Sequence, residues 1–315
     1  MTERGERASG MPRMPMAWRS LLALIVCLGP PRAPAHDAAA PLPLAWRPRV
    51  PLEGSVLLLG LRSPADDSVV AVRGELAGEP LHFERVADEF RAIAAVPLDA
   101  RDSVTVHVML ERAGGASDTV AVSVPVRRRR VLRERLRAAP DLVQPPESLG
   151  ERIRTERDLV QDVRRRSHDT PRLWREPFLR PRPGAVTGHF GDARVFNGVL
   201  ASRHLGVDFA GRTGAAIRSA NRGVVVLVAD LYLSGTTVMI DHGAGLVTGY
   251  LHLSRALVTP GDTVARGQLI GHVGASGRVT GPHLHWLAAY GAVTVDPLSL
   301  IELDFGGPLR VNRLR

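Results

Sequence analysis

Residues 280–286 read TGPHLHW, and two histidines, His283 and His285, flank Leu284 directly after a Thr-Gly-Pro turn. Alternate residues of an extended strand point to the same face of a sheet. If this stretch is a strand, both imidazoles face one spot, which indicates a metal site. The spacing leaves open whether both histidines bind the metal or whether one has another role.

A second pair of candidate ligands precedes this stretch by about eighty residues. The segment RHLGVDFA (203–210) holds His204 and Asp208, whose spacing of four places them on one face. Gly206 lies between them and no helix signal surrounds them, which favours a strand or loop. Imidazole nitrogens and a carboxylate oxygen suit Zn²⁺, and the HLH pair can supply a further nitrogen. Three protein ligands would leave a fourth position for water, as in catalytic zinc sites.

The region around both motifs has a β pattern. From Val186 to about Leu303, short Val/Leu/Ile runs alternate with glycines, as in GVVVLVAD, TTVMIDHG and QLIGHVG. Seven of the eleven histidines lie in this segment. The clustering motivates a site there, and His189, His242 and His272 are interpreted as structural.

Residues 36–130 are predicted to form a separate β-sandwich of immunoglobulin-like type. The stretch SVTVHVML (103–110) alternates valine and leucine on one face, and TVAVSVPV (119–126) does the same after a Gly-rich turn. Nothing in this region has a catalytic pattern, so we expect a spacer, shield or binding module.

Residues 131–183 are predicted to be a basic linker with one helix. The run RRRRVLRERLR (127–137) fits contact with an anionic polymer or simply a solvated linker. Ser148 and Glu151 have the spacing of a capping box, which predicts a helix of about 18 residues bridging two domains. The prolines of PFLRPRPG (177–184) mark the next boundary, and residues 304–315 are predicted to be a tail.

The first 35 residues are typical of a secretory signal peptide. Four arginines precede the apolar run LLALIVCL (21–28), and APA (33–35) follows as a cleavage site before His36. The run is too short to span a bilayer, so we expect no transmembrane segment in the mature chain, and an uncleaved anchor is the alternative. Export would place the protein in the periplasm, the cell envelope or the medium. The only cysteine, Cys27, lies in this run, so the mature chain would have no disulfide or thiolate ligand.

The charge of the chain fits an anionic partner, although compositional bias is the preferred explanation for most of its arginines. Its formal net charge is +9, all 41 basic residues are arginine, and removal of the leader leaves about +6. Nucleic acid is one such partner and an anionic cell-envelope polymer is another. The leader and the low aromatic content of 4% argue against nucleic acid.

The order of motifs from residue 184 to 301 resembles the lysostaphin-type (beta-lytic) family of zinc metalloendopeptidases, which cleave peptidoglycan cross-bridges. RHLGVDFAGRTGAAIRSANRGVVV, VMIDHGAGLVTGYLHLS, VTPGDTVARGQLIGHVGASGRVTGPHLHW and VDPLSLI follow one another here as in that family. The resemblance implies an antiparallel β domain at residues 184–303, with the site in a groove. Trp286 stands where phenylalanine is commoner, and the loop around LYLSG (231–235) differs, which leaves substrate preference open.

The resemblance also implies the role of each site residue. It assigns one zinc ion per chain to three ligands, His204, Asp208 and His285. It assigns catalysis to His252, in the YLHLS stretch, and to His283. These two would orient or deprotonate a zinc-bound water and stabilise the charged intermediate.

Three other functions remain as alternatives to an exported zinc metalloendopeptidase. A non-catalytic family member that activates other cell-wall hydrolases would keep the fold but lose ligands, whereas all five residues are present. PGDTVARGQLIGHVG resembles a biotinyl/lipoyl-type hairpin, but the chain has no lysine to modify, which leaves only an unmodified adaptor. A nucleic-acid binder is suggested by charge alone. The expected bond is a D-alanyl–diaminopimelate cross-link of peptidoglycan, with glycine bridges left open, and no protein partner is indicated.

Overall fold

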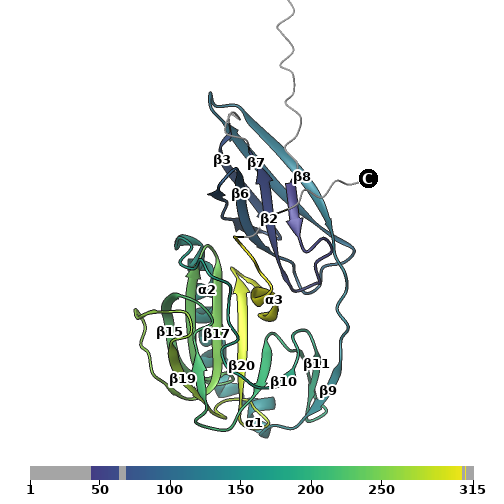
Figure 1. Cartoon of the computed structure of the whole chain (residues 1–315). Coiled ribbons are helices and arrows are strands. Elements are labelled where there is room, and N and C mark those ends of the chain that lie inside the picture. Colours follow the sequence, from purple (N-terminus) through teal and green to yellow (C-terminus); the bar gives the residue numbers. More distant parts are fainter. Residues whose placement is uncertain (1–43, 64–68, 307–308, 310–315) are drawn as a thin grey trace, which may run out of the picture. The chain divides into compact units, whose positions relative to one another are not determined.

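The fold is mainly antiparallel β, as predicted, in a computed structural model that describes residues 44–63, 69–306 and 309 (Figure 1). The predicted leader, residues 1–35, lies outside the described residues. The described residues belong to one compact unit. The boundaries at residues 131 and 184 therefore stay predictions.

Two four-stranded antiparallel sheets form the N-terminal part. The first has the order β1-β2-β6-β5, with β1 (Leu44–Arg47), β2 (Val56–Arg62), β6 (Glu89–Ala95) and β5 (Glu84–Val86). The second has the order β4-β3-β7-β8, with β4 (Glu79–Leu81), β3 (Val69–Leu76), β7 (Ser103–Arg112) and β8 (Ser117–Pro125). The buried side chains of both sheets belong to one apolar cluster, which agrees with a sandwich.

The predicted alternation along β7 and β8 is confirmed. Val106, Val108 and Leu110 of β7 are buried while Thr105, His107 and Met109 are exposed, and Val124 is buried on β8. One face of each strand therefore lies on the core and the other faces solvent. The finer assignment to an immunoglobulin-like topology stays a prediction.

A ten-stranded sheet forms the C-terminal part. Its main path is β10-β13-β20-β17-β16-β15-β18, made of β10 (Val186–Gly188), β13 (Val207–Ala210), β20 (His283–Tyr290), β17 (Leu246–Ala256), β16 (Gly235–Gly243), β15 (Gly223–Leu231) and β18 (Thr263–Val264). Off this path, β14 (Ala216–Arg218) pairs with β19 (Leu269–Val273), β19 also pairs with β17, and β21 (Val293–Val295) pairs with β20. All its pairings are antiparallel.

Strand β20 lies in the interior of this sheet, between β13 and β17 (Figure 1). Leu284, Trp286 and Tyr290 of β20 have no exposed surface, and neither has Tyr250 of the neighbouring β17. Leu284, Trp286 and Tyr290 share one face of β20, and their burial fixes its register, since a slip of one residue would exchange the two faces of the strand. The strand that carries the two histidines is therefore held firmly in place.

A smaller three-stranded sheet has the order β12-β11-β9, with β12 (Leu200–Arg203), β11 (Ala193–Phe196) and β9 (Arg133–Leu136). Strand β9 comes from the segment predicted to be a linker, and it pairs with β11 in parallel. Its sequence RERL alternates exposed arginines with the half-buried Glu134 and Leu136. A period-two pattern of four residues does not distinguish a strand from a charged linker in the sequence.

The predicted linker helix is present as α2 (Gly150–Arg166), but its predicted capping box is wrong. Ser148 lies in the 3₁₀ turn η1 (Glu147–Leu149), and the residue that caps α2 is Leu149, which makes no side-chain capping bond. The 3₁₀ turn continues directly into the helix, so Ser148 is inside helical backbone and cannot act as a cap.

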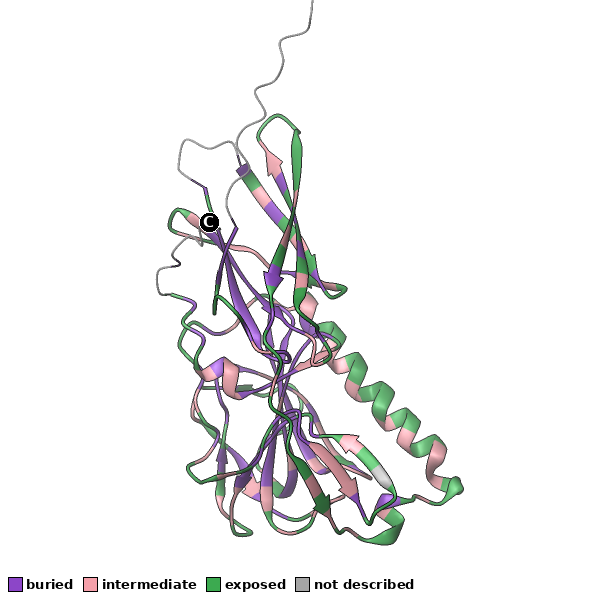
Figure 2. Ribbon diagram, turned by 90° about the vertical axis from the view of Figure 1, so that its right-hand side faces the viewer, coloured by how far each residue is buried: buried purple, intermediate pink, exposed green. Residues whose placement is uncertain are grey.

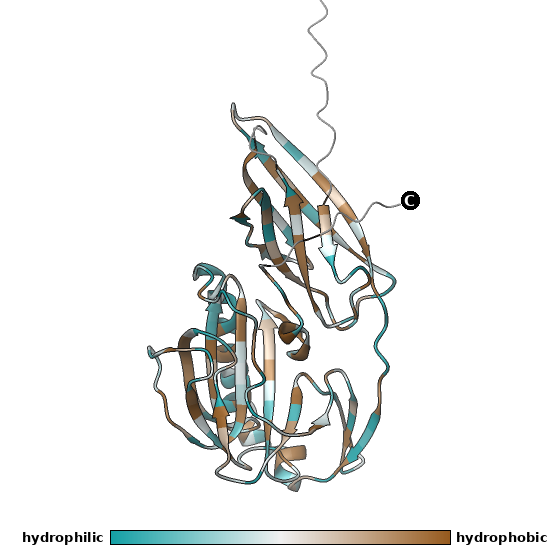
Figure 3. Ribbon diagram, viewed as in Figure 1, coloured by the Kyte–Doolittle hydropathy of each residue, from teal (hydrophilic) through white to brown (hydrophobic). Residues whose placement is uncertain are grey.

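Helix α2 packs against the C-terminal sheet. Val160 and Val163 contact the buried cluster of Leu227, Met239 and Val247, while most of the helix surface is exposed (Figure 2). The remaining short helices are α1 (Pro140–Val143), η2 (Ser167–Asp169) and α3 (Leu298–Ile301), the last of which is strongly apolar (Figure 3). Among the described residues, none of the helices has both the length and the apolar character needed to cross a membrane.

Candidate metal centre

Three of the predicted site residues meet where β13 and β20 pair. His204 lies in the turn before β13, Asp208 lies within β13, and His285 lies opposite Asp208 in the register of β20. All three are buried, with exposed fractions of 3%, 6% and 9%. The expectation that residues 204–208 form a loop and strand rather than a helix is confirmed.

The three donor atoms form a nearly equilateral triangle. His204 Nε2 lies 3.1 Å from Asp208 Oδ1 and 3.0 Å from His285 Nδ1, and the last two atoms are 2.9 Å apart. A tetrahedral zinc site with ligand distances of about 2.0–2.1 Å has edges of about 3.3–3.4 Å. The triangle therefore needs to expand by only a few tenths of an ångström to hold such an ion. In the part of the chain that the structure describes, this is the one cluster of that kind.

The protonation states of the cluster favour a cation. His204 Nδ1 donates to the carbonyl of His189 at 2.8 Å, so that in the neutral ring Nε2 carries the lone pair. Burial alone would raise the pKa of Asp208, but the imidazoles of His204 and His285 lower it well below its ordinary value. Burial lowers the pKa of His285, which favours the neutral ring. A carboxylate and neutral imidazoles are the ligand forms that bind a metal ion.

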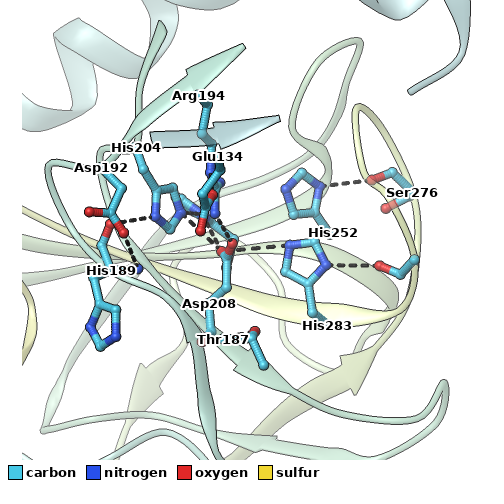
Figure 4. A network of polar contacts seen from close by, with 12 residues as sticks. Glu134, Thr187, His189, Asp192, Arg194, His204, Asp208, His252, Ser276 and His283 are labelled. Carbon is cyan, nitrogen blue, oxygen red and sulfur yellow. Dashed lines mark hydrogen bonds and ion pairs between the residues drawn. The ribbon is translucent and has the colours of Figure 1, made fainter. Parts of the chain in front are cut away.

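The second oxygen of Asp208 has its own partner, Arg194 of β11 (Figure 4). The Nη2 atom of Arg194 donates to Asp208 Oδ2 at 2.6 Å, and its Nε donates to Glu134 of β9 at 2.7 Å. All three side chains are mostly buried. Because Oδ2 is held by the guanidinium, Oδ1 is left to face the two imidazoles.

The other two predicted residues, His252 and His283, stand beside the triangle with a common arrangement. His252 Nδ1 donates to the carbonyl of Ser276, and His283 Nδ1 donates to the carbonyl of Gly281, each at 2.8 Å (Figure 4). The opposite nitrogen of each ring, Nε2, therefore carries a lone pair in the neutral form. Their ring centroids are 5.1 Å apart, and His283 Nε2 lies 3.6 Å from Asp208 Oδ1.

The environment of His252 keeps its ring neutral. Burial, reinforced by the nearby rings of His285 and His283, lowers the pKa of His252 to about 3. Its backbone is also unusual, with φ at 64°, a left-handed conformation that β-carbon-bearing residues rarely adopt. The amide of His252 donates to the carbonyl of Ser234 at 3.0 Å, which helps to hold this conformation. Such local strain is often found at functional sites.

Two glycines make room for the cluster. A β-carbon at Gly188 would lie 2.4 Å from Arg194 Nη2 and 2.8 Å from Asp208 Oδ2. A β-carbon at Gly206 would lie 2.4 Å from His285 Nε2. A side chain at Gly188 would displace Arg194 and Asp208, and a side chain at Gly206 would displace His285.

The structure thus brings together all five residues that the sequence singled out, His204, Asp208, His252, His283 and His285. It groups His285, and not His283, with the other two donor atoms. His242 is fully buried and donates to the carbonyl of Arg222, which agrees with its structural interpretation. Sequence reasoning missed Arg194 and Glu134, because no local pattern relates strands β9 and β11 to residue 208.

Comparisons with known proteins agree with this geometry. Residues 202–297 match Peptidase family M23. A peptidoglycan DD-endopeptidase, ShyA, from Vibrio cholerae is 48% identical over 83 residues, which are 26% of this chain and 19% of that protein. A DD-carboxypeptidase/endopeptidase, Mpg, from Neisseria meningitidis is 39% identical over 97 residues, which are 31% of this chain and 22% of that protein. The matched regions thus span about a fifth of these curated relatives.

A solved structure resembles a larger part of the chain. The crystal structure described as a peptidase M23 from Pseudomonas aeruginosa has 27% sequence identity and a TM-score of 0.61. The similarity covers 80% of this chain and 94% of that one. It therefore extends beyond the segment that matches the family.

We expect the three donor residues to be needed for metal binding and the two neighbouring histidines to be dispensable for it. Alanine at His204, Asp208 or His285 removes one corner of the triangle, so these variants should lose most of their bound metal. Alanine at His252 or His283 should leave about one ion per chain, because neither belongs to the triangle. Metal content of the purified, folded variants after dialysis measures this.

The exposed His107 of β7 offers a control, since His107→Ala should keep its metal. Loss of metal from His283→Ala together with its retention in His285→Ala would mean that the two roles are reversed.

Arg194 should strengthen metal binding without touching the ion, because it holds the free oxygen of the Asp208 carboxylate. Removal of a partner that orients a ligand typically weakens metal affinity by about 10- to 100-fold. We expect Arg194→Met to show a weakening in that range when the protein competes with a chromogenic chelator for the metal. Glu134→Gln should have a smaller effect, because the contact between Arg194 and Asp208 remains.

The exposed Arg255 of β17 provides the matched control, and Arg255→Met should bind metal like the unchanged protein. Wild-type affinity in Arg194→Met would show that the guanidinium does not orient Asp208.

Proposed function

We propose that this chain is a zinc metallopeptidase that hydrolyses the peptide cross-links of peptidoglycan, because residues 202–297 match Peptidase family M23. The observation that carries the proposal is the triangle of His204, Asp208 and His285, flanked by the imidazoles of His252 and His283, whose Nδ1 atoms are each held by a backbone carbonyl. A ligand set of two imidazoles and one carboxylate is a known catalytic zinc arrangement, which leaves a fourth position for water or substrate.

At such a site the metal supplies Lewis-acid polarisation of the scissile carbonyl and activation of the attacking water. The protein supplies proton transfer. His252 and His283 each direct Nε2 into the site because a backbone carbonyl holds Nδ1. One imidazole takes a proton as water attacks the carbonyl carbon, and a proton passes to the amine nitrogen as the C–N bond breaks. The resulting imidazolium also stabilises negative charge on the carbonyl oxygen.

For the substrate, we propose the bond between D-alanine and diaminopimelate in cross-linked peptidoglycan. The names of two relatives support it, since one is a DD-endopeptidase and the other a DD-carboxypeptidase/endopeptidase. A non-catalytic role as activator of other hydrolases has less support, because the expected ligands and both histidines are together in the site.

Activity should depend on the metal and on both flanking histidines. Chelation should abolish cleavage of purified muropeptide dimers, and zinc should restore it. His252→Ala and His283→Ala should retain metal but lose about 10²- to 10⁴-fold in kcat, the range for removal of a general acid or base. Mass spectrometry of the released peptides measures the rate and identifies the bond.

The same control, His107→Ala, should cleave at the wild-type rate. If wild-type protein with one zinc ion per chain releases nothing from any cross-linked muropeptide, the proposed activity is wrong and a non-catalytic role takes its place.

We further propose that the protein is exported and acts in the periplasm or cell envelope, with residues 1–35 removed. The support is the sequence pattern of this segment, which lies outside the described residues. The full chain produced in a Gram-negative host should appear in the periplasmic fraction with His36 at its N-terminus, as N-terminal sequencing can determine. Retention of residues 1–35 would contradict cleavage and indicate an anchor.

A further inference from the structure

A pocket of about 330 Å³ opens beside the metal centre. Asp208, His252 and His283 line it on one side. Its wall also includes Arg194 and Arg278, the latter in the segment that leads into β20. A substrate with its scissile bond at the metal centre therefore lies within reach of this wall.

The two arginines of the pocket differ in whether an acidic side chain pairs with the guanidinium. Arg194 is paired with both Glu134 and Asp208. Arg278 is half-buried, and among residues 44–63, 69–306 and 309 its guanidinium has no acidic partner. Burial lowers the pKa of Arg278, and the charge of Arg194 adds to this effect. Arg278 thus brings to the pocket wall a cationic group that has no acidic partner of its own, and an anionic ligand group would stabilise it.

The position of Arg278 is fixed before any ligand arrives. Its guanidinium lies over the ring of Phe196 in β11, with Cζ 5.0 Å from the ring centroid. Its backbone amide donates to the carbonyl of Leu233 at 2.8 Å. The preceding Gly277 has φ at 75°, and a β-carbon there would lie 2.4 Å from the amide nitrogen of Gly235. Close backbone packing therefore holds this segment against the β15–β16 turn and limits the freedom of the side chain.

We propose that Arg278 binds the substrate carboxylate that lies next to the scissile amide and so makes the enzyme selective for carboxylated D-residues. The inference rests on the proposed function and specifies its substrate class. In a D-alanyl–diaminopimelate cross-link, the carbon bonded to the scissile nitrogen bears a free carboxylate, as it does in a D-alanyl-D-alanine terminus. A glycine bridge continues as a neutral amide at that carbon. A planar guanidinium is matched to a carboxylate through two parallel hydrogen bonds.

The test compares two muropeptide dimers that differ at one group. One has the free carboxylate of diaminopimelate next to the scissile amide, and the other has that carboxylate converted to an amide. Hydrogen bonds to a charged group are worth enough to change kcat/KM by about 10- to 100-fold, so the wild-type protein should prefer the carboxylate by that factor. Arg278→Gln should cleave both substrates with nearly equal kcat/KM, at about the wild-type value for the amide. Arg278→Lys should retain part of the preference, and the control Arg255→Gln all of it.

Equal wild-type kcat/KM for the two dimers would overturn the inference while the proposed function stands. The inference would also fail if Arg278→Gln lowered kcat/KM by the same factor for the carboxylate dimer and the amide dimer. An equal loss on both substrates is the effect expected of a residue that only supports the structure. Metal content of each variant, which should stay at one ion per chain, separates substrate binding from damage to the centre.

If wild-type protein cleaves neither dimer, the proposed function fails and binding decides the role of Arg278. Zinc-loaded wild-type protein should then bind the carboxylate form about 10- to 100-fold more tightly than the amide in a calorimetric titration, and Arg278→Gln should bind them equally. Equal wild-type affinities would overturn the inference in that case too.

Discussion

The carboxylate of Asp208 is the group on which the rest of the site depends, because its two oxygens have different tasks. A buried carboxylate is costly unless both oxygens are satisfied. Arg194 satisfies Oδ2 from β11, while Oδ1 faces the imidazoles of His204 and His285. His204 Nδ1 donates to a backbone carbonyl, so in the neutral ring Nε2 carries a lone pair. This lone pair faces the carboxylate oxygen Asp208 Oδ1, and two acceptors in contact repel each other. A cation at the centre of the three atoms would resolve this conflict, and the three donor atoms are close enough together to hold one.

Strand pairing places Asp208, His285 and His252 close together. Asp208 and His285 face each other across β13 and β20, and Leu251, the neighbour of His252, pairs with His285 from β17. Three adjacent strands thus bring two of the candidate ligands and a catalytic candidate together, with the apolar side chains of β20 fixing the register. Backbone carbonyls then set the orientation of His252 and His283, so that both present the same nitrogen to the site.

The sequence predicts those parts of the site whose signals are local. The HLH stretch places two imidazoles on one strand face, and the spacing of His204 and Asp208 allows a shared face, so both motifs could be recognised by residue spacing. The β-rich fold follows similarly from short alternating runs. Arg194 and Arg278 could not be found in this way, because their roles arise from contacts with distant strands in a chain that has 41 arginines. The capping box failed for a different reason, since a 3₁₀ turn merges into the helix before the expected cap.

The parallel pairing of β9 with β11 places part of the pocket wall outside the segment that matches the family. Glu134, Arg194 and Phe196 all precede residue 202, yet they neutralise, orient or support groups that face the centre. The segment that matches the family therefore does not include all the residues that line the pocket. A chimera that exchanged only residues 202–297 between two such proteins would transplant the ligands into a foreign charge environment. A chimera that keeps the contacts of Glu134, Arg194 and Phe196 has to include strands β9 and β11 together with residues 202–297.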